Sequence, residues 1–208
     1  MTKTIIFDLG GVILTIDHDE ALRRFTALGL KDAATWLDPY TQKGIFGELE
    51  NGLISAEDFR RELGNIIGRE VTMAECEHAW QGYAKEVPQR NLDVLVRLRQ
   101  EGYRVILLSN TNPCMMAWAL SPAFDGHGHS LDHYFDALYL SYRMKVMKPD
   151  ETFFRRVLIA EQTPPSQCLF VDDGPRNVAA ASQIGISTFC PCNGEDWTKE
   201  IFNYIERQ

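Results

Sequence analysis

Polar side chains that could do chemistry follow three apolar runs of this chain. They are Asp8, then Ser109 with Asn110, then the pair Asp172 and Asp173, and Lys148 before Pro149 adds a cation. Any one of them alone could be a helix cap or a solvated side chain. In an open α/β sheet, however, ligands bind beyond the carboxyl ends of the strands. Because most of these polar residues follow apolar runs, together they predict one polar site at that edge of the sheet.

These residue types suit the transfer of a phosphoryl group. Carboxylates that lie close together repel, so they need a cation, and oxygen ligands suit Mg²⁺. A hydroxyl, backbone N–H groups and a lysine can hold the remaining charge of a phosphoryl group. One carboxylate facing phosphorus is then a competent nucleophile. The glycines after Asp8, Gly10 and Gly11, let the backbone approach closely.

The apolar runs predict the strands that would position these groups. They are 4–7, 104–108, 168–171 and 186–189, with 135–140 as a fifth, and helical patterns lie between them at 91–100, 153–160 and 176–184. Continuous hydrophobicity is typical of parallel strands covered on both faces. Strands that alternate with helices in this order predict an α/β, Rossmann-like open parallel sheet.

The segment 17–88 differs, because it has no convincing strand and several helix starts. Ser55 with Asp58 and Thr72 with Glu75 match the capping-box pattern. We expect a small helical cap domain at 17–88, inserted after the first strand, on a core domain of 1–16 and 89–208.

Length, charge and cysteines limit the kinds of protein this can be. The 208 residues are 45% hydrophobic and carry a net charge of −8, which argues against nucleic acid as a partner. No apolar window reaches the roughly 18 residues of a membrane span, and we expect no membrane partner. Five cysteines without regular spacing, and no signal peptide, favour the cytoplasm.

Four stretches in order resemble the motifs of the haloacid dehalogenase superfamily, most of whose members are Mg²⁺-dependent phosphatases. They are FDLGGV at 7–12, LLSN at 107–110, MKP at 147–149 and VDDGPRN at 171–177. The resemblance spans nearly the whole chain. Within the superfamily the chain looks most like bacterial sugar-phosphate phosphatases similar to α-D-glucose-1-phosphate phosphatase.

This resemblance implies a role for each matching residue. Asp8 would be the nucleophile and a metal ligand, Gly10 would offer its carbonyl to the metal, Asp173 would bind the metal and Asp172 would hold its waters. Ser109 and Lys148 would bind the phosphoryl group, with backbone help from Asn110 and Gly11.

One position departs from the family pattern. The family's phosphatases usually carry a general acid–base Asp two residues after the nucleophile, and here that residue is Gly10. Such help is typically worth ~10²–10⁴-fold in rate. The substrate could have a good leaving group, another acid such as Asp17 could replace the missing one, or catalysis could be lost. We favour the first two, because the other site residues are present.

The helical segment holds further candidates for substrate contact. Glu48 and Glu50 in GELENG could meet sugar hydroxyls or could be solvated loop residues. Its aromatic residues are expected to be mostly core, and one or two of them could face the sheet and cover the substrate; they are Trp36, Phe46, Phe59, Trp80 and Tyr83.

The expected function is that of a cytoplasmic Mg²⁺-dependent phosphatase of a small phosphorylated metabolite, with a sugar phosphate as the expected substrate. It would act as a monomer or homodimer through an aspartyl-phosphate. The alternatives are a metal-independent 2-haloacid dehalogenase and a non-catalytic phosphometabolite-binding module.

Overall fold

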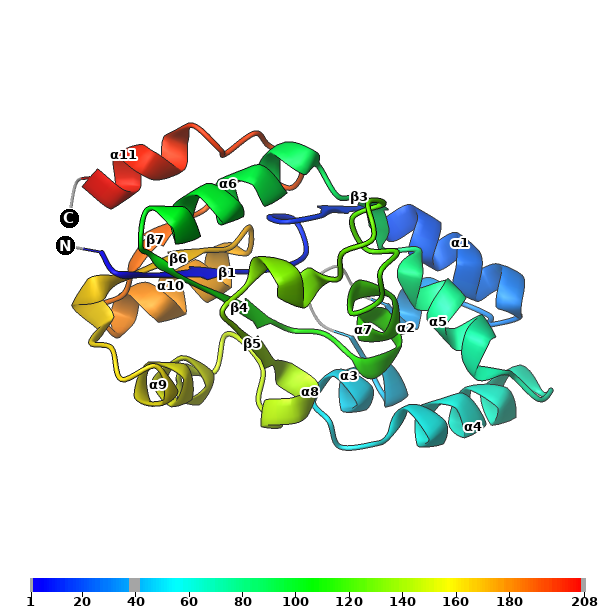
Figure 1. Ribbon diagram of the computed structural model, residues 1–208. Helices are drawn as coiled ribbons and strands as arrows, with labels where there is room; N and C mark the ends of the chain where they lie inside the picture. Colours follow the sequence, from blue (N-terminus) through cyan, green and yellow to red (C-terminus); the bar gives the residue numbers. More distant parts are fainter. Residues whose placement is uncertain (1, 38–41, 207–208) are drawn as a thin grey trace.

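The computed structural model describes residues 2–37 and 42–206 (Figure 1). Within these residues, parallel strands form one open sheet in the order β5-β4-β1-β6-β7. Their bounds are Thr4–Phe7 (β1), Arg104–Ser109 (β4), Ala137–Leu140 (β5), Cys168–Val171 (β6) and Ser187–Phe189 (β7). This confirms the expected α/β fold with a parallel sheet.

Helices cover both faces of this sheet, with α6 and α11 on one face and α9 and α10 on the other (Figure 1). Their bounds are Gln89–Gln100 (α6), Glu151–Ala160 (α9), Pro175–Gln183 (α10) and Glu200–Glu206 (α11). Successive side chains of β1 point to opposite faces, so Ile5 and Phe7 pack in the cluster under α6 while Ile6 packs in the other. The central strands β1, β4 and β6 are mostly apolar because both faces of the sheet are covered there.

Short elements complete the part of the chain around the sheet. They are α7 (Pro113–Ala119), α8 (Ser141–Met144) and the 3-10 helices η1 (Leu131–Tyr134) and η2 (Pro165–Gln167). Asn112 caps α7 by accepting a hydrogen bond from the Met115 N–H, and Pro113 begins the helix. Among residues 2–37 and 42–206, no helix has both the length and the apolar character needed to cross a bilayer.

The segment inserted after β1 forms a second helical layer with an aromatic core of its own. Its helices are α1 (His18–Leu28), α2 (Ala33–Trp36), α3 (Ile45–Glu50), α4 (Ala56–Ile67) and α5 (Met73–Gln81). Phe46 lies at the centre, with ring centroids 5.1 to 5.7 Å from those of Phe25, Phe59 and Trp80. Both predicted capping boxes, at Ser55 and Thr72, are formed.

One prediction about the inserted segment is wrong. A short antiparallel pair, β2 (Thr15–Ile16) with β3 (Ala84–Glu86), joins its two ends. β3 lies inside 17–88, where no strand was expected, because one half-buried and two exposed residues carry no hydrophobic pattern. The segment also packs on the rest of the chain, since Cys114 of α7 lies in its hydrophobic cluster.

Candidate functional site

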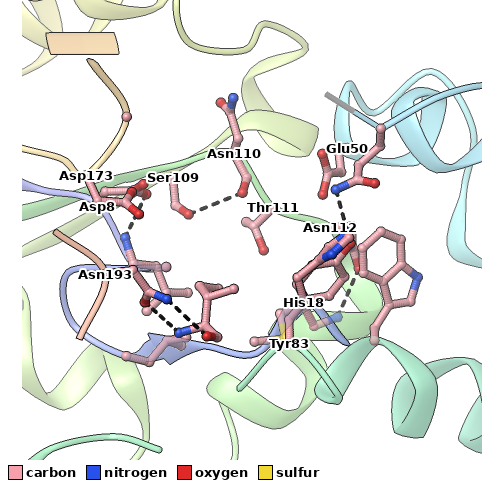
Figure 2. A pocket seen from close by; sticks show the side chains of 18 of the residues that line it. Asp8, His18, Glu50, Tyr83, Ser109, Asn110, Thr111, Asn112, Asp173 and Asn193 are labelled. Atoms are coloured by element: carbon pink, nitrogen blue, oxygen red, sulfur yellow. Dashed lines mark hydrogen bonds between the residues drawn. The ribbon is translucent and has the colours of Figure 1, made fainter. Parts of the chain in front are cut away.

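The central strand brings the predicted polar residues together. β1 pairs with β4 on one side and with β6 on the other. Asp8 therefore lies between Ser109, the last residue of β4, and Asp172, the first residue after β6. Figure 2 shows Asp8, Ser109 and Asp173 at one end of a cavity of about 600 Å³.

Lys148 is buried between two of these carboxylates. Its Nζ lies 2.9 Å from Asp8 Oδ1 and 2.6 Å from Asp172 Oδ2, and its side chain is 1% exposed. Burial lowers the pKa of Lys148, but the charges of Asp172 and Asp8 outweigh it and raise that pKa overall. Lys148 is therefore held as a cation beside the predicted nucleophile.

Two asparagines position these charged groups. The Asn110 side chain accepts a hydrogen bond from the Lys148 N–H at 2.8 Å and donates one to the Lys148 carbonyl at 2.9 Å. Asp172 accepts hydrogen bonds from the Gly174 N–H and from the Asn177 amide. The Asn110 side chain thus positions the Lys148 backbone, a role that the sequence did not indicate.

The carboxylates of Asp8, Asp172 and Asp173 fit a divalent cation. Each can offer an oxygen, and these oxygens lie within 4.8 Å of one another. Burial raises the pKa of Asp8 to about 7 against the lowering effect of Lys148, and the other two carboxylates add to the rise. Burial, followed by the Asp172 charge, raises the pKa of Asp173 to about 6. A hard cation bound to oxygen ligands would relieve this repulsion.

The two glycines of the first loop have different surroundings. A Cβ on Gly11, whose φ is +75°, would lie 2.0 Å from Asp173 Oδ2, so only glycine lets that carboxylate approach. The Gly11 N–H donates to the Leu14 carbonyl, and we therefore do not retain Gly11 as a substrate contact. A Cβ on Gly10 would lie 2.8 Å from Ile16 Cδ1. The Ile16 side chain would therefore have to shift to admit an acidic side chain at residue 10.

Asp17 lines the same cavity from the start of α1. It is the N-cap of that helix, and its Oδ1 accepts a hydrogen bond from the Glu20 N–H at 2.9 Å. The residue predicted as a replacement acid therefore faces the cavity and caps a helix at the same time.

The two acidic candidates of GELENG have different positions. They lie on helix α3, not on a loop, and Glu48 is exposed outside the cavity while Glu50 is 8% exposed and lines it. Trp80 and Tyr83 line the cavity as well. Sequence reasoning missed other lining residues, among them His18, Gln42, Thr111, Asn112, Asn177 and Asn193. Three of these could have been suspected, because Thr111 and Asn112 directly follow LLSN and Asn177 is the last residue of VDDGPRN.

Comparison with known proteins agrees with this geometry. The family model for haloacid dehalogenase-like hydrolases matches residues 2–185. The chain belongs to this family. The four motif stretches and most of the parallel sheet of this haloacid dehalogenase-like hydrolase lie within the matched residues.

Individual relatives cover almost the whole of this hydrolase. It is 49% identical over 201 residues to a D-ribitol-5-phosphate phosphatase of Bacteroides thetaiotaomicron, and the match covers 97% of each chain. A HAD-like family hydrolase from Porphyromonas gingivalis has a similar structure, with a TM-score of 0.94 and 41% identity over 100% of both chains.

A second solved structure bears on the metal. A HAD family enzyme from Bacteroides thetaiotaomicron, in complex with magnesium and inorganic phosphate, matches with a TM-score of 0.86 and 32% identity. The match covers 96% of this hydrolase and 99% of that enzyme.

Proposed function

We propose that this hydrolase is a Mg²⁺-dependent phosphatase of a small sugar or polyol phosphate. The observation that carries the proposal is the buried contact of Lys148 with both Asp8 and Asp172, beside Ser109 and Asp173. The name of the D-ribitol-5-phosphate phosphatase relative supports a phosphorylated polyol as substrate.

In this proposal Asp8 attacks phosphorus, so that a bond forms from its carboxylate oxygen and the bond to the substrate oxygen breaks. Lys148 and the Ser109 hydroxyl hold the equatorial phosphoryl oxygens, with backbone help from Asn110. Water then cleaves the aspartyl-phosphate and releases inorganic phosphate. Asp8, Asp173 and the Gly10 carbonyl would hold Mg²⁺, with Asp172 holding its waters, and the ion would supply positive charge next to the phosphoryl group.

We also propose that residues 17–88 act as a cap domain over a core of 1–16 and 89–208. The cavity is lined from both parts, with Asp17 and Glu50 on one side and Asp8 and Ser109 on the other. A cap in this position excludes water from the transferring phosphoryl group.

The proposal is tested by phosphate release from a panel of phosphorylated sugars and polyols, with Mg²⁺ and with a chelator. We expect release that stops with the chelator and returns with Mg²⁺. Chelator-resistant activity on a 2-chloroacid would point to the dehalogenase alternative instead. Binding of these phosphates with Mg²⁺ but without turnover would point to the non-catalytic module.

The Asp17→Asn variant tests the replacement acid. Asparagine is as good an N-cap as aspartate, so helix α1 should keep its cap while the proton donor is lost. If Asp17 protonates the leaving oxygen, turnover of alkyl phosphates should fall by about 10²-fold or more, and turnover of anomeric phosphates should fall much less. Equal effects on both would remove Asp17 from the mechanism.

A further inference from the structure

The cavity has a second polar end, away from Asp8. Figure 2 shows Glu50, Asn112, His18 and Tyr83 on the side opposite to Asp8 and Asp173. Gln42 belongs to this end, since its Nε2 donates to the Tyr83 hydroxyl at 3.3 Å. These side chains come from the inserted segment and from the loop after β4, so this end is assembled from segments distant in sequence.

We propose that Glu50, Gln42 and Asn112 form a subsite that binds the uncharged hydroxyl groups at the far end of an extended phosphorylated polyol or sugar. This inference rests on the proposed phosphatase function and deepens it, because it assigns residues to the recognition of the substrate beyond its phosphate.

Glu50 is suited to hydroxyl groups because its surroundings oppose a negative charge. It is the last residue of helix α3, where the backbone carbonyls also disfavour an anion. Burial raises the pKa of Glu50 to about 8, and a hydrogen bond with the Asn112 side chain opposes this only in part. A neutral carboxyl donates through its O–H and accepts through its other oxygen.

Gln42 provides the complementary group. Its Oε1 is buried and has no hydrogen-bond partner among the described residues, and Gln42 lines the cavity. An unpartnered buried acceptor is costly, so a ligand that satisfies it gains affinity. A hydroxyl both donates and accepts, and it can therefore pair with the Gln42 oxygen and with the neutral Glu50 carboxyl.

The distance of this subsite from the phosphoryl end is fixed by a hydrogen-bonded bridge. The buried Ser141 hydroxyl donates to the Glu50 carbonyl at 2.7 Å and accepts from the Thr111 N–H at 3.0 Å. Thr111 is two residues after Ser109. Glu50 thus belongs to the inserted helices but is tied to the loop that carries the phosphate-binding hydroxyl, and the site favours substrates of matching length.

The test compares D-ribitol 5-phosphate with pentyl phosphate, which has the same chain length without the hydroxyls. The ratio of the two kcat/KM values measures recognition of the hydroxyls. Glu50→Ala should lower this ratio about tenfold to a hundredfold, mainly through KM for the polyol. Glu50→Gln, which is neutral and keeps a donor and an acceptor, should stay within about threefold of the natural chain.

Glu48→Ala is the matched control, because Glu48 lies on the same helix, is exposed and lies outside the cavity. Its ratio should equal that of the natural chain. An unchanged ratio in Glu50→Ala would overturn the proposal. A Glu50→Gln ratio as low as that of Glu50→Ala would also overturn it, since the carboxylate charge would then be needed.

Calorimetric binding to Asp8→Asn separates this proposal from the proposed function. With Mg²⁺ present, this variant should bind D-ribitol 5-phosphate more tightly than pentyl phosphate, and adding Glu50→Ala should remove the preference. If that preference is found although the natural chain hydrolyses neither compound, the phosphatase proposal fails and the subsite stands. If both compounds bind equally, the subsite is wrong whatever the turnover.

Discussion

The two ends of the cavity are built in opposite ways. At one end Lys148 lies between Asp8 and Asp172 and forms ion pairs with both carboxylates. At the other end, within the described residues, Glu50 is buried without a cation partner and Gln42 Oε1 has no hydrogen-bond partner. The first end is suited to a charged, reacting group and the second to neutral groups that only bind.

From this difference we expect the charged end to determine kcat and the neutral end to determine which substrates bind. Preorganised charges stabilise a transition state, and their loss lowers kcat. Hydrogen bonds to a distant, unreactive part of the substrate act on binding and on discrimination. Substitutions at the two ends should therefore separate into effects on chemistry and effects on specificity.

The largest effect should come from Asp8→Asn. The amide is nearly isosteric but is no nucleophile, so kcat should fall by more than about 10⁴-fold. Circular dichroism and the melting temperature serve as the check that the variant folds. If the variant kept even a tenth of the kcat of the natural chain, Asp8 would not be the nucleophile. The end of the cavity around Asp8 could then no longer be distinguished as the catalytic one.

Lys148→Met should show that the charged end is held by ion pairing. Removing one member of a buried pair leaves uncompensated charge and typically costs about 3–5 kcal/mol in the free energy of unfolding. Urea unfolding with a chelator present measures this cost. Lys85→Met is the control, since Lys85 also lines the cavity but is exposed, and its cost should stay below about 0.5 kcal/mol. Equal losses in the free energy of unfolding for Lys148→Met and Lys85→Met would show that ion pairing does not hold the charged end together.

Glu50→Gln should show that the other end is built for a neutral group. The pKa of Glu50 is about 8 in the fold, whereas the ordinary value for a glutamate in water is 4.5. Between these values the unfolded chain has released the proton and the folded chain has kept it, so the natural chain loses stability as pH rises from 4.5 to 8. Glu50→Gln removes this loss.

The stability gain of Glu50→Gln should be near zero at pH 4.5 and reach about 2–4 kcal/mol at pH 8. Urea unfolding of both proteins at several pH values measures it, with Glu48→Gln as the control that shows no such trend. A gain that shrinks as pH rises would mean that Glu50 is stabilised as a carboxylate.

The smallest effect on turnover should come from restoring the general acid that is absent at residue 10. Gly10→Asp should raise turnover of alkyl phosphates by less than about tenfold, although a working general acid is worth ~10²–10⁴-fold. The reason is that the new Cβ would lie 2.8 Å from Ile16 Cδ1, so the Ile16 side chain has to shift before an acid fits at residue 10. Combining it with Ile16→Ala should give a larger gain. A full gain from Gly10→Asp alone would show that Ile16 moves aside freely.

The charged end could be predicted from the sequence because its residues lie at the carboxyl ends of recognisable strands. Asp8, Ser109 and Asp172 directly follow or end apolar runs, and neighbouring parallel strands bring such positions to one edge. The strands of the sheet were predicted to within two residues, since continuous apolar runs are typical of buried parallel strands. Helices α6, α9 and α10 were predicted equally closely from their apolar periodicity, whereas α7, α8 and α11 were not predicted.

The other end could not be predicted, because tertiary contacts create it. Glu50 lies in a polar stretch that resembles a solvated loop, and it is buried only because helix α3 packs on the segment around Ser141. Gln42 has no motif around it. The β3 strand was missed for a related reason, since pairing with β2 and not hydrophobicity defines it.

The most direct test of the account is to locate the phosphoryl group during turnover. The natural chain would be mixed with Mg²⁺ and D-ribitol 5-phosphate, quenched with acid within milliseconds, and its peptides examined by mass spectrometry. We expect one added phosphoryl group on the peptide containing Asp8, and none in Asp8→Asn. A phosphoryl group on a different residue, or phosphate release by Asp8→Asn at the natural rate, would contradict the account.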